Sequence, residues 1–120
     1  MVNLEAIERL DRVIHERNRL AIMTVLAAAE SRSFKELREQ LQMTDGNLCV
    51  HLRALEESGY VSARKSFVNR KPRTDYALTE EGRRAFQEYI QTMAEIVRLS
   101  KEIEEGRVRE APPALQPGLA

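Results

Sequence analysis

The chain lacks several features on which other classes of protein depend. It has 120 residues, one cysteine and no tryptophan, and its longest apolar stretch, Leu20 to Ala29, is too short to cross a bilayer. One cysteine excludes an internal disulfide and a cysteine-rich metal site. The first residues are acidic and amphipathic, unlike a signal peptide. We therefore expect a single small domain in the cytoplasm, without a membrane partner.

Features of an enzyme are also missing. The sequence has no glycine-rich phosphate loop. If the first predicted helix extends to His15, Asp11 and His15 lie on the same face of it. No Ser or Cys is placed to act with them as a nucleophile. We therefore interpret Asp11 and His15 as a helix-surface pair. The possible metal ligands Cys49, His15 and His51 are too few and too scattered for a metal sensor. We expect no enzymatic activity, no cofactor and no metal.

The formal net charge is zero, because 19 Lys and Arg balance 19 Asp and Glu. The charges are nevertheless unevenly distributed. Between Ser62 and Arg73 there are five cations and no acid, whereas acids outnumber cations from Glu80 to Glu110. A local basic segment of this kind is typical of a surface that meets a polyanion. The five cations are Arg64, Lys65, Arg70, Lys71 and Arg73.

Apolar spacing and capping residues predict five helices. Ser33 and Glu36 form a capping box, Thr44 caps the next helix, and Ser58-Gly59 ends it. The short helix, tight turn and second helix that result form a helix-turn-helix. The expected helices cover residues 3–14, 19–29, 33–41, 44–58 and, after a cap at Thr79, about 80–105.

The helix over residues 44–58 has two different faces. Leu48, Leu52 and Leu55 recur at helical spacing with His51 beside them, so this side is expected to face a core, with His51 as a half-buried packing residue. The opposite side lacks the long charged side chains of an ordinary surface helix. Small residues and hydrogen-bonding groups suit close contact with the major groove of DNA. This outer face consists of Gly46, Asn47, Cys49, Val50 and Arg53.

A β-hairpin is expected next. Residues 60–68 and 74–78 are rich in strand formers, and residues 69–73, which include Pro72, predict a loose turn with a protruding tip. Residues 106–120 contain three prolines and are expected to be a disordered tail.

Two stretches carry a family resemblance: G-N-L-C-V-H-L-R-A-L-E-E-S-G-Y-V, and K-S-F-V-N-R-K-P-R-T-D-Y-A-L-T-E-E-G-R-R-A-F. They resemble the MarR/ArsR-like winged-helix transcriptional regulators of bacteria and archaea, of the small single-domain type. The resemblance covers Ile14 to Tyr89. It implies a mainly α fold with a small β-hairpin, that is, a winged helix-turn-helix with N- and C-terminal dimerisation helices. The DNA-binding domain, with these terminal helices, would cover residues 1–105. It also implies that residues 44–58 are the recognition helix and residues 64–73 the wing.

The residues agree with sequence-specific binding of double-stranded DNA. Asn47 and Arg53 suit adenine and guanine edges, and Val50 suits a thymine methyl group. Gly46 lets the helix start approach a phosphate. The wing cations would follow the phosphate backbone or enter the minor groove. The expected contacts are Thr44, Gly46, Asn47, Val50, Arg53, Arg64, Lys65, Arg70, Lys71 and Arg73.

Apolar residues of the terminal helices extend beyond what a small domain covers. We expect a homodimer through these helices, on an inverted repeat with half-sites about 10 bp apart or a multiple of that. The alternative is that both helices pack on their own domain. The expected interface residues are Leu4, Ile7, Leu10, Ile90, Met93, Ile96, Val97 and Ile103.

Other interpretations stay open. The wing cations could serve only to keep an edge hairpin soluble, and Arg53 could be an ordinary solvated arginine. Cys49 is read as a small residue rather than as a redox switch. The main alternative function is a winged helix for protein interaction, with weak and non-specific DNA affinity. A small-molecule effector is a third possibility, but no polar cluster nominates a pocket.

Overall fold

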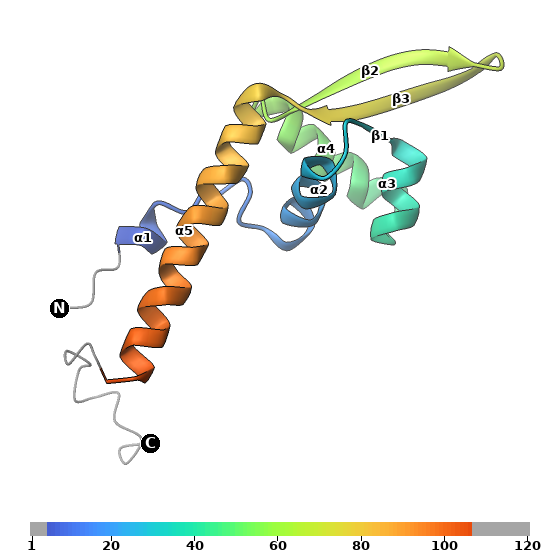
Figure 1. The fold of residues 1–120 in the computed structure, drawn as a ribbon. Helices are drawn as coiled ribbons and strands as arrows, with labels where there is room; N and C mark the ends of the chain where they lie inside the picture. Colours follow the sequence, from blue (N-terminus) through green and yellow to red (C-terminus); the bar gives the residue numbers. More distant parts are fainter. Residues whose placement is uncertain (1–4, 107–120) are drawn as a thin grey trace. The chain divides into compact units, whose positions relative to one another are not determined.

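The structure is a computed structural model that describes residues 5–106. It forms two compact units, one from Asp11 to Tyr89 and one from the segments before and after it. Figure 1 shows the order of the elements. They are α1 (Glu5–Glu8), α2 (Arg17–Ala27), β1 (Arg32–Ser33), α3 (Phe34–Leu41), α4 (Asp45–Glu57), β2 (Val61–Val68), β3 (Lys71–Leu78) and α5 (Glu80–Glu104).

The larger unit is mainly helical and contains a three-stranded antiparallel sheet of order β1-β3-β2. The helix-turn-helix and the hairpin were expected, and strand β1 was not. It has two residues, Arg32 and Ser33, which pair with Tyr76 and Asp75. Ser33 also caps α3, and its hydroxyl accepts from the Glu36 amide. Two residues are too few for an alternating pattern, so no sequence signal marked this strand.

The core of the larger unit lies among α2, α3, α4 and the base of the hairpin. Each large apolar side chain buried there contributes about 1.5–3 kcal/mol relative to exposure. The leucine stripe predicted for residues 44–58 is confirmed as the buried side of α4. The buried core side chains of this unit are Ile14, Ile22, Met23, Leu26, Leu37, Leu48, Leu52, Leu55, Val61 and, from α5, Tyr89.

The first predicted helix is wrong in length, because α1 ends at Glu8 instead of Ile14. The carboxylate of Asp11 accepts from the amides of Val13 (2.8 Å) and Ile14 (3.2 Å), and this local turn competes with a helix. The pairing of Asp11 with His15 on a helix surface is wrong for the same reason. Asp11 also accepts from the Tyr60 hydroxyl at 2.5 Å.

The predicted loose turn of the hairpin is also wrong. Val68 pairs with Lys71, so the turn contains only Asn69 and Arg70, whose φ angles are 53° and 67°. Positive φ at both positions is the signature of a type I′ turn. Pro72 lies within β3 opposite Phe67, one pair from the turn. That pair is of the non-hydrogen-bonded kind, so the missing N–H of Pro72 faces an open edge and costs no ladder bond.

Hydrogen bonds connect the start of α5 to Gly59, which follows α4. Gly59, with φ 79°, ends α4 as expected. The Thr79 hydroxyl donates to the Gly59 carbonyl (2.5 Å) and accepts from the Gly82 amide (2.9 Å), which confirms the predicted cap at Thr79. Gly82 allows the backbones to touch, since a Cβ there would lie 2.0 Å from the Tyr60 oxygen.

The smaller unit consists, in its described part, of α1 and the part of α5 from Ile90 onward. Ala6 is buried in it, and Arg9 forms an ion pair with Glu95. Large apolar side chains remain exposed on both helices. Leu4 and residues 107–120 lie outside the described residues, and with them nearly all of the predicted tail. None of the helices within residues 5–106 has the length and hydropathy needed to span a membrane.

Candidate nucleic-acid interface

The turn between α3 and α4 fixes the start of the predicted recognition helix. Gln42 ends α3 in the left-handed conformation, with φ 54°. Thr44 then caps α4, its hydroxyl accepting from the Asn47 amide at 3.1 Å. Arg38 of α3 and Asp45 of α4 form an ion pair across the turn at 3.0 Å. The cap leaves the first turn of α4 ordered and solvent-accessible, as a helix end that meets a ligand must be.

The outer face of α4 is exposed as the sequence predicted. Asn47, Val50 and Arg53 are exposed, and Val50 keeps 61% of its surface accessible. No ion pair involves Arg53 within residues 5–106. A Cβ at Gly46 would meet nothing within 4 Å, so packing does not require glycine there. Glycine inside a helix costs up to about 1 kcal/mol relative to alanine, and the fold gains nothing in return.

The inner side of α4 is held by a polar cluster around His51, whose side chain is 15% exposed. Its ring nitrogens lie 3.3 Å from Asn18 Nδ2 and 3.3 Å from an Arg19 guanidinium nitrogen. Burial alone would raise the pKa of Glu16, but hydrogen bonds from the Arg19 amide and the charges of His51 and Arg19 lower it overall. The cluster fixes α4 against the start of α2 and confirms His51 as a packing residue. Its partners are more than thirty residues away in sequence, so sequence reasoning missed them.

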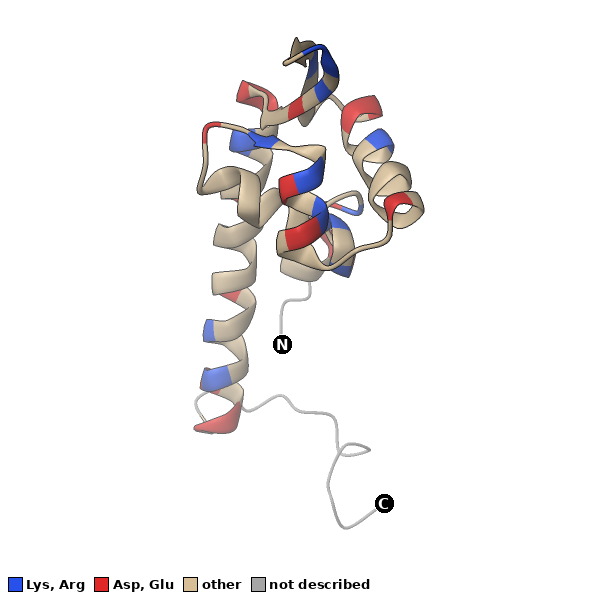
Figure 2. Cartoon of the chain, turned by 90° about the vertical axis from the view of Figure 1, so that its right-hand side faces the viewer, with Lys and Arg blue, Asp and Glu red and all other residues tan. Residues whose placement is uncertain are grey.

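The five cations of the wing are all exposed, but they have different surroundings. Figure 2 shows basic residues along the hairpin. Arg73 is held by two acids, Asp75 at 3.1 Å and Glu36 at 3.6 Å, and so ties β3 to α3. No acid in the described part of the chain pairs with Arg64, Lys65, Arg70 or Lys71. Four positive charges are therefore available to an anion.

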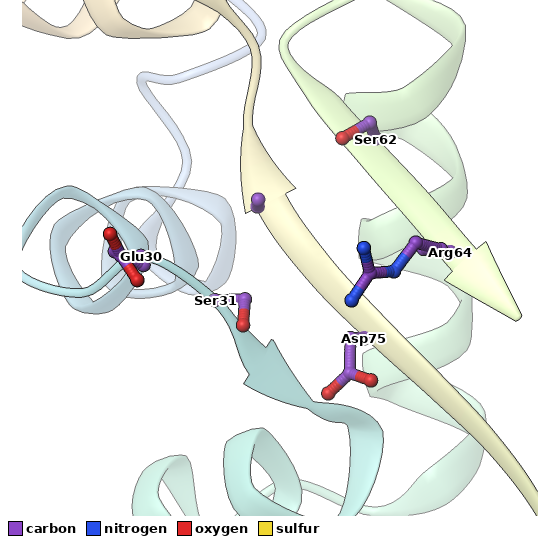
Figure 3. A pocket seen from close by; sticks show the side chains of 6 residues that line it. Glu30, Ser31, Ser62, Arg64 and Asp75 are labelled. Atoms are coloured by element: carbon purple, nitrogen blue, oxygen red, sulfur yellow. The ribbon is translucent and has the colours of Figure 1, made fainter. Parts of the chain in front are cut away.

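Arg64 lies at a pocket of about 300 Å³ on the sheet. Figure 3 shows Arg64 and Asp75 extending into it from neighbouring strands, with Ser62 on the same strand as Arg64. Glu30 and Ser31 line the other side. The lining combines the carboxylates of Glu30 and Asp75 with the guanidinium of Arg64, so the pocket has mixed charge and does not favour an anionic ligand. Arg64 lies at the edge of this pocket and contributes its charge to the wing.

No group of three or more His, Cys, Asp and Glu residues suited to a metal occurs within residues 5–106. Cys49 is a free, exposed thiol on α4. Burial raises the pKa of Tyr76 of β3, and the charges of Glu56 and Cys49 add to the shift.

Comparison with known proteins gives consistent matches. Residues 18–97 match a protein family described as winged helix DNA-binding domain. An uncharacterised protein of Methanocaldococcus jannaschii is 43% identical over 86 residues, 72% of this chain and 90% of that protein. The solved structure of a transcriptional regulator homologue from Pyrococcus horikoshii aligns with a TM-score of 0.73 and 28% identity, over 82% of this chain and 96% of that one.

Two further solved structures share the architecture. HlyU from Vibrio cholerae aligns with a TM-score of 0.55 and 25% identity, over 63% of this chain and 78% of that one. A putative regulator of the MarR family from Enterococcus faecalis has the same fold, with a TM-score of 0.62 and 24% identity over 87% and 88% of the two chains. The resemblance to MarR/ArsR-like winged-helix regulators is confirmed.

Proposed function

We propose that this chain, which belongs to the family of winged-helix DNA-binding domains, is a transcriptional regulator that recognises a specific sequence in double-stranded DNA. The observation that carries the proposal is the outer face of α4. The buried leucine stripe fixes α4, and the helix presents the amide of Asn47, the apolar side chain of Val50 and the guanidinium of Arg53, unpaired within residues 5–106, to solvent. Beside it, the hairpin presents four cations that no acid of the described residues neutralises.

In this proposal α4 enters the major groove. Arg53 donates to a guanine edge, Asn47 contacts adenine, and Val50 meets a thymine methyl group. Thr44 and Gly46 bring the first turn of the helix to a backbone phosphate, where free amides and the dipole favour an anion. In this proposal the phosphate lies too close to position 46 for a larger residue, which accounts for a glycine that the packing of α4 does not require.

The wing contributes affinity. Arg64, Lys65, Arg70 and Lys71 bind phosphates or the minor groove, and each neutralised phosphate steepens the dependence of log K on log salt by about 0.9. Arg73 adds charge nearby, but its guanidinium is already shared between Asp75 and Glu36. We therefore assign Arg73 a mainly positioning role, in which it holds the wing against α3.

We also propose that the regulator acts in the cytoplasm and is a homodimer. The exposed apolar side chains of α1 and α5 support the homodimer: Ile7 (52%), Ile90 (48%), Val97 (49%) and Ile103 (37%). Leu10, Met93 and Ile96 would complete the surface with Leu4. A two-fold dimer would bind an inverted repeat with half-sites about 10 bp apart or a multiple of that.

Fluorescence anisotropy tests the proposal. A duplex selected by the wild-type protein from a random library is compared with a scrambled duplex of equal composition. We expect a clear preference for the selected duplex, lost in Arg53→Ala and retained in Arg84→Ala, which removes an exposed arginine of α5 outside the proposed interface. Arg70→Glu with Lys71→Glu should abolish binding to both duplexes. Equal, weak binding to both duplexes, unchanged by Arg53→Ala, would favour a protein-interaction module instead.

A further inference from the structure

The most exposed large apolar side chain of the described residues lies in the wing. Phe67 keeps 76% of its surface accessible, more than Val50 or any exposed large apolar residue of α5. Its cross-strand partner is Pro72, also exposed. Figure 1 shows that this end of the hairpin reaches beyond α2, α3 and α4. The ring of Phe67 therefore lies mostly in solvent, with Pro72 as its cross-strand neighbour.

The side of the hairpin on which Phe67 lies follows from strand alternation. Val61, Ala63, Lys65 and Phe67 share one face of β2 because side chains alternate along a strand. Val61 is 3% exposed, so this is the face turned toward the core. Along β2 only Val61 is buried. The same face is already exposed at Ala63, whose partner Tyr76 is half-buried, and it continues into solvent with Lys65 and Phe67.

Phe67 lies near the tip of the hairpin, one pair away from Val68 and Lys71, which flank the turn. Lys65 on the same face, with Arg70 and Lys71 at the tip, surrounds it with positive charge that no described acid pairs.

Pairing within the hairpin explains only part of this arrangement. A Phe–Pro cross-strand contact stabilises a hairpin modestly, and a β-branched residue would do so without exposing an aromatic ring. An exposed apolar side chain ringed by unpaired cations instead complements a polyanion with an apolar interior. DNA has that chemistry, with charged phosphates outside and stacked bases within.

We propose that Phe67 is a wedge that enters the minor groove and partly unstacks one base step, while Lys65, Arg70 and Lys71 bind the flanking phosphates. Apolar wedges, Phe among them, kink duplexes in this way in architectural DNA-binding proteins. The narrow two-residue turn keeps the hairpin tip slim enough to enter a groove. The proposal rests on the proposed DNA-binding function and adds a deformation of the DNA to it.

The test uses the full chain and the selected duplex, with 2-aminopurine placed at successive adenine positions. We compare wild type with Phe67→Thr, which keeps a strand former but removes the ring. Val68→Thr is the matched control, an adjacent residue on the opposite face of β2. Thermal unfolding of each variant, followed by circular dichroism, verifies that the fold is intact.

We expect wild type to raise 2-aminopurine fluorescence at one step of each half-site, by about threefold or more, as unstacking does. Phe67→Thr should abolish the rise and weaken binding by about 10- to 100-fold, the range for loss of base–aromatic stacking. Val68→Thr should leave both unchanged. If wild type binds selectively in an Arg53-dependent way but no position brightens, or if Phe67→Thr brightens equally, the wedge is refuted and the proposed function stands. If wild type shows no selective binding, both proposals are refuted.

Discussion

Replacing Gly82 by alanine sets two physical effects of opposite sign against each other. Gly82 lies in the first turn of α5, where alanine would favour the helix by about 0.8–1.0 kcal/mol. The added Cβ, however, would lie 2.0 Å from the carbonyl oxygen of Tyr60, where ordinary contact requires at least 3.4 Å. The obstacle is backbone on both sides, so no rotamer change relieves it.

The loss of stability can be worked out from the contacts that break when α5 moves away from Tyr60. Moving α5 away from Tyr60 to restore contact breaks the bond from the Thr79 amide to the Tyr60 carbonyl (3.0 Å) and that from the Thr79 hydroxyl to Gly59. Each bond is worth about 0.5–1.5 kcal/mol net, and the loosened packing around Tyr60 adds to the loss. We expect Gly82→Ala to lower the free energy of unfolding by about 2–4 kcal/mol, despite the gain in helix propensity.

Urea unfolding followed by circular dichroism measures the effect, with Gly46→Ala as the control. Gly46 has open space around it, so alanine there should stabilise the protein by up to about 1 kcal/mol. The two variants make the same chemical change in a helix and should have opposite signs. A Gly82→Ala protein at least as stable as wild type would refute the close approach of α5 to Tyr60.

Three further changes have defined outcomes. Tyr60→Phe removes the hydrogen bond to Asp11 and should cost about 1–3 kcal/mol in urea unfolding. Burial and Asp11 raise the pKa of Tyr60 from 10.0 to about 12. The stabilisation by the Tyr60 hydroxyl should therefore be complete below pH 10 and disappear as the pH rises through 12. Phenolate absorbance of the folded protein should show no titration of Tyr60 near pH 10. The Ser33 amide and hydroxyl lower the pKa of Glu36, so Glu36→Gln should flatten the loss of stability that wild type shows as pH falls below 4.5. Arg70→Gly relieves a positive φ and should stabilise the hairpin by about 1 kcal/mol, while anisotropy shows a salt slope lower by about 0.9.

The parts of the fold that sequence predicted are those set by local chemistry. The leucine stripe of α4, its cap at Thr44 and its end at Gly59 depend on residues a few positions apart. The exposed outer face followed directly, because the residues opposite a buried helical stripe must face solvent. The capping box at Ser33 was equally local and is present.

The errors arose where a distant residue decides the local structure. The sequence predicts a loose turn that includes Pro72, but the register of β2 against β3 places Pro72 within β3, where no ladder bond is needed. Asp11 ends the first helix through a side-chain turn that Tyr60 reinforces from forty-nine positions away. Arg73 has the same charge as its neighbours, and only the structure shows that Asp75 and Glu36 already engage it.

The most direct test of the central claim, that α4 reads bases, is a competition assay at each base pair of the selected duplex for wild type and Arg53→Ala. The account predicts that the variant loses discrimination at one base pair per half-site, by about 1–3 kcal/mol, and keeps it elsewhere. A variant that weakens binding to all sequences equally, with every base preference intact, would contradict it.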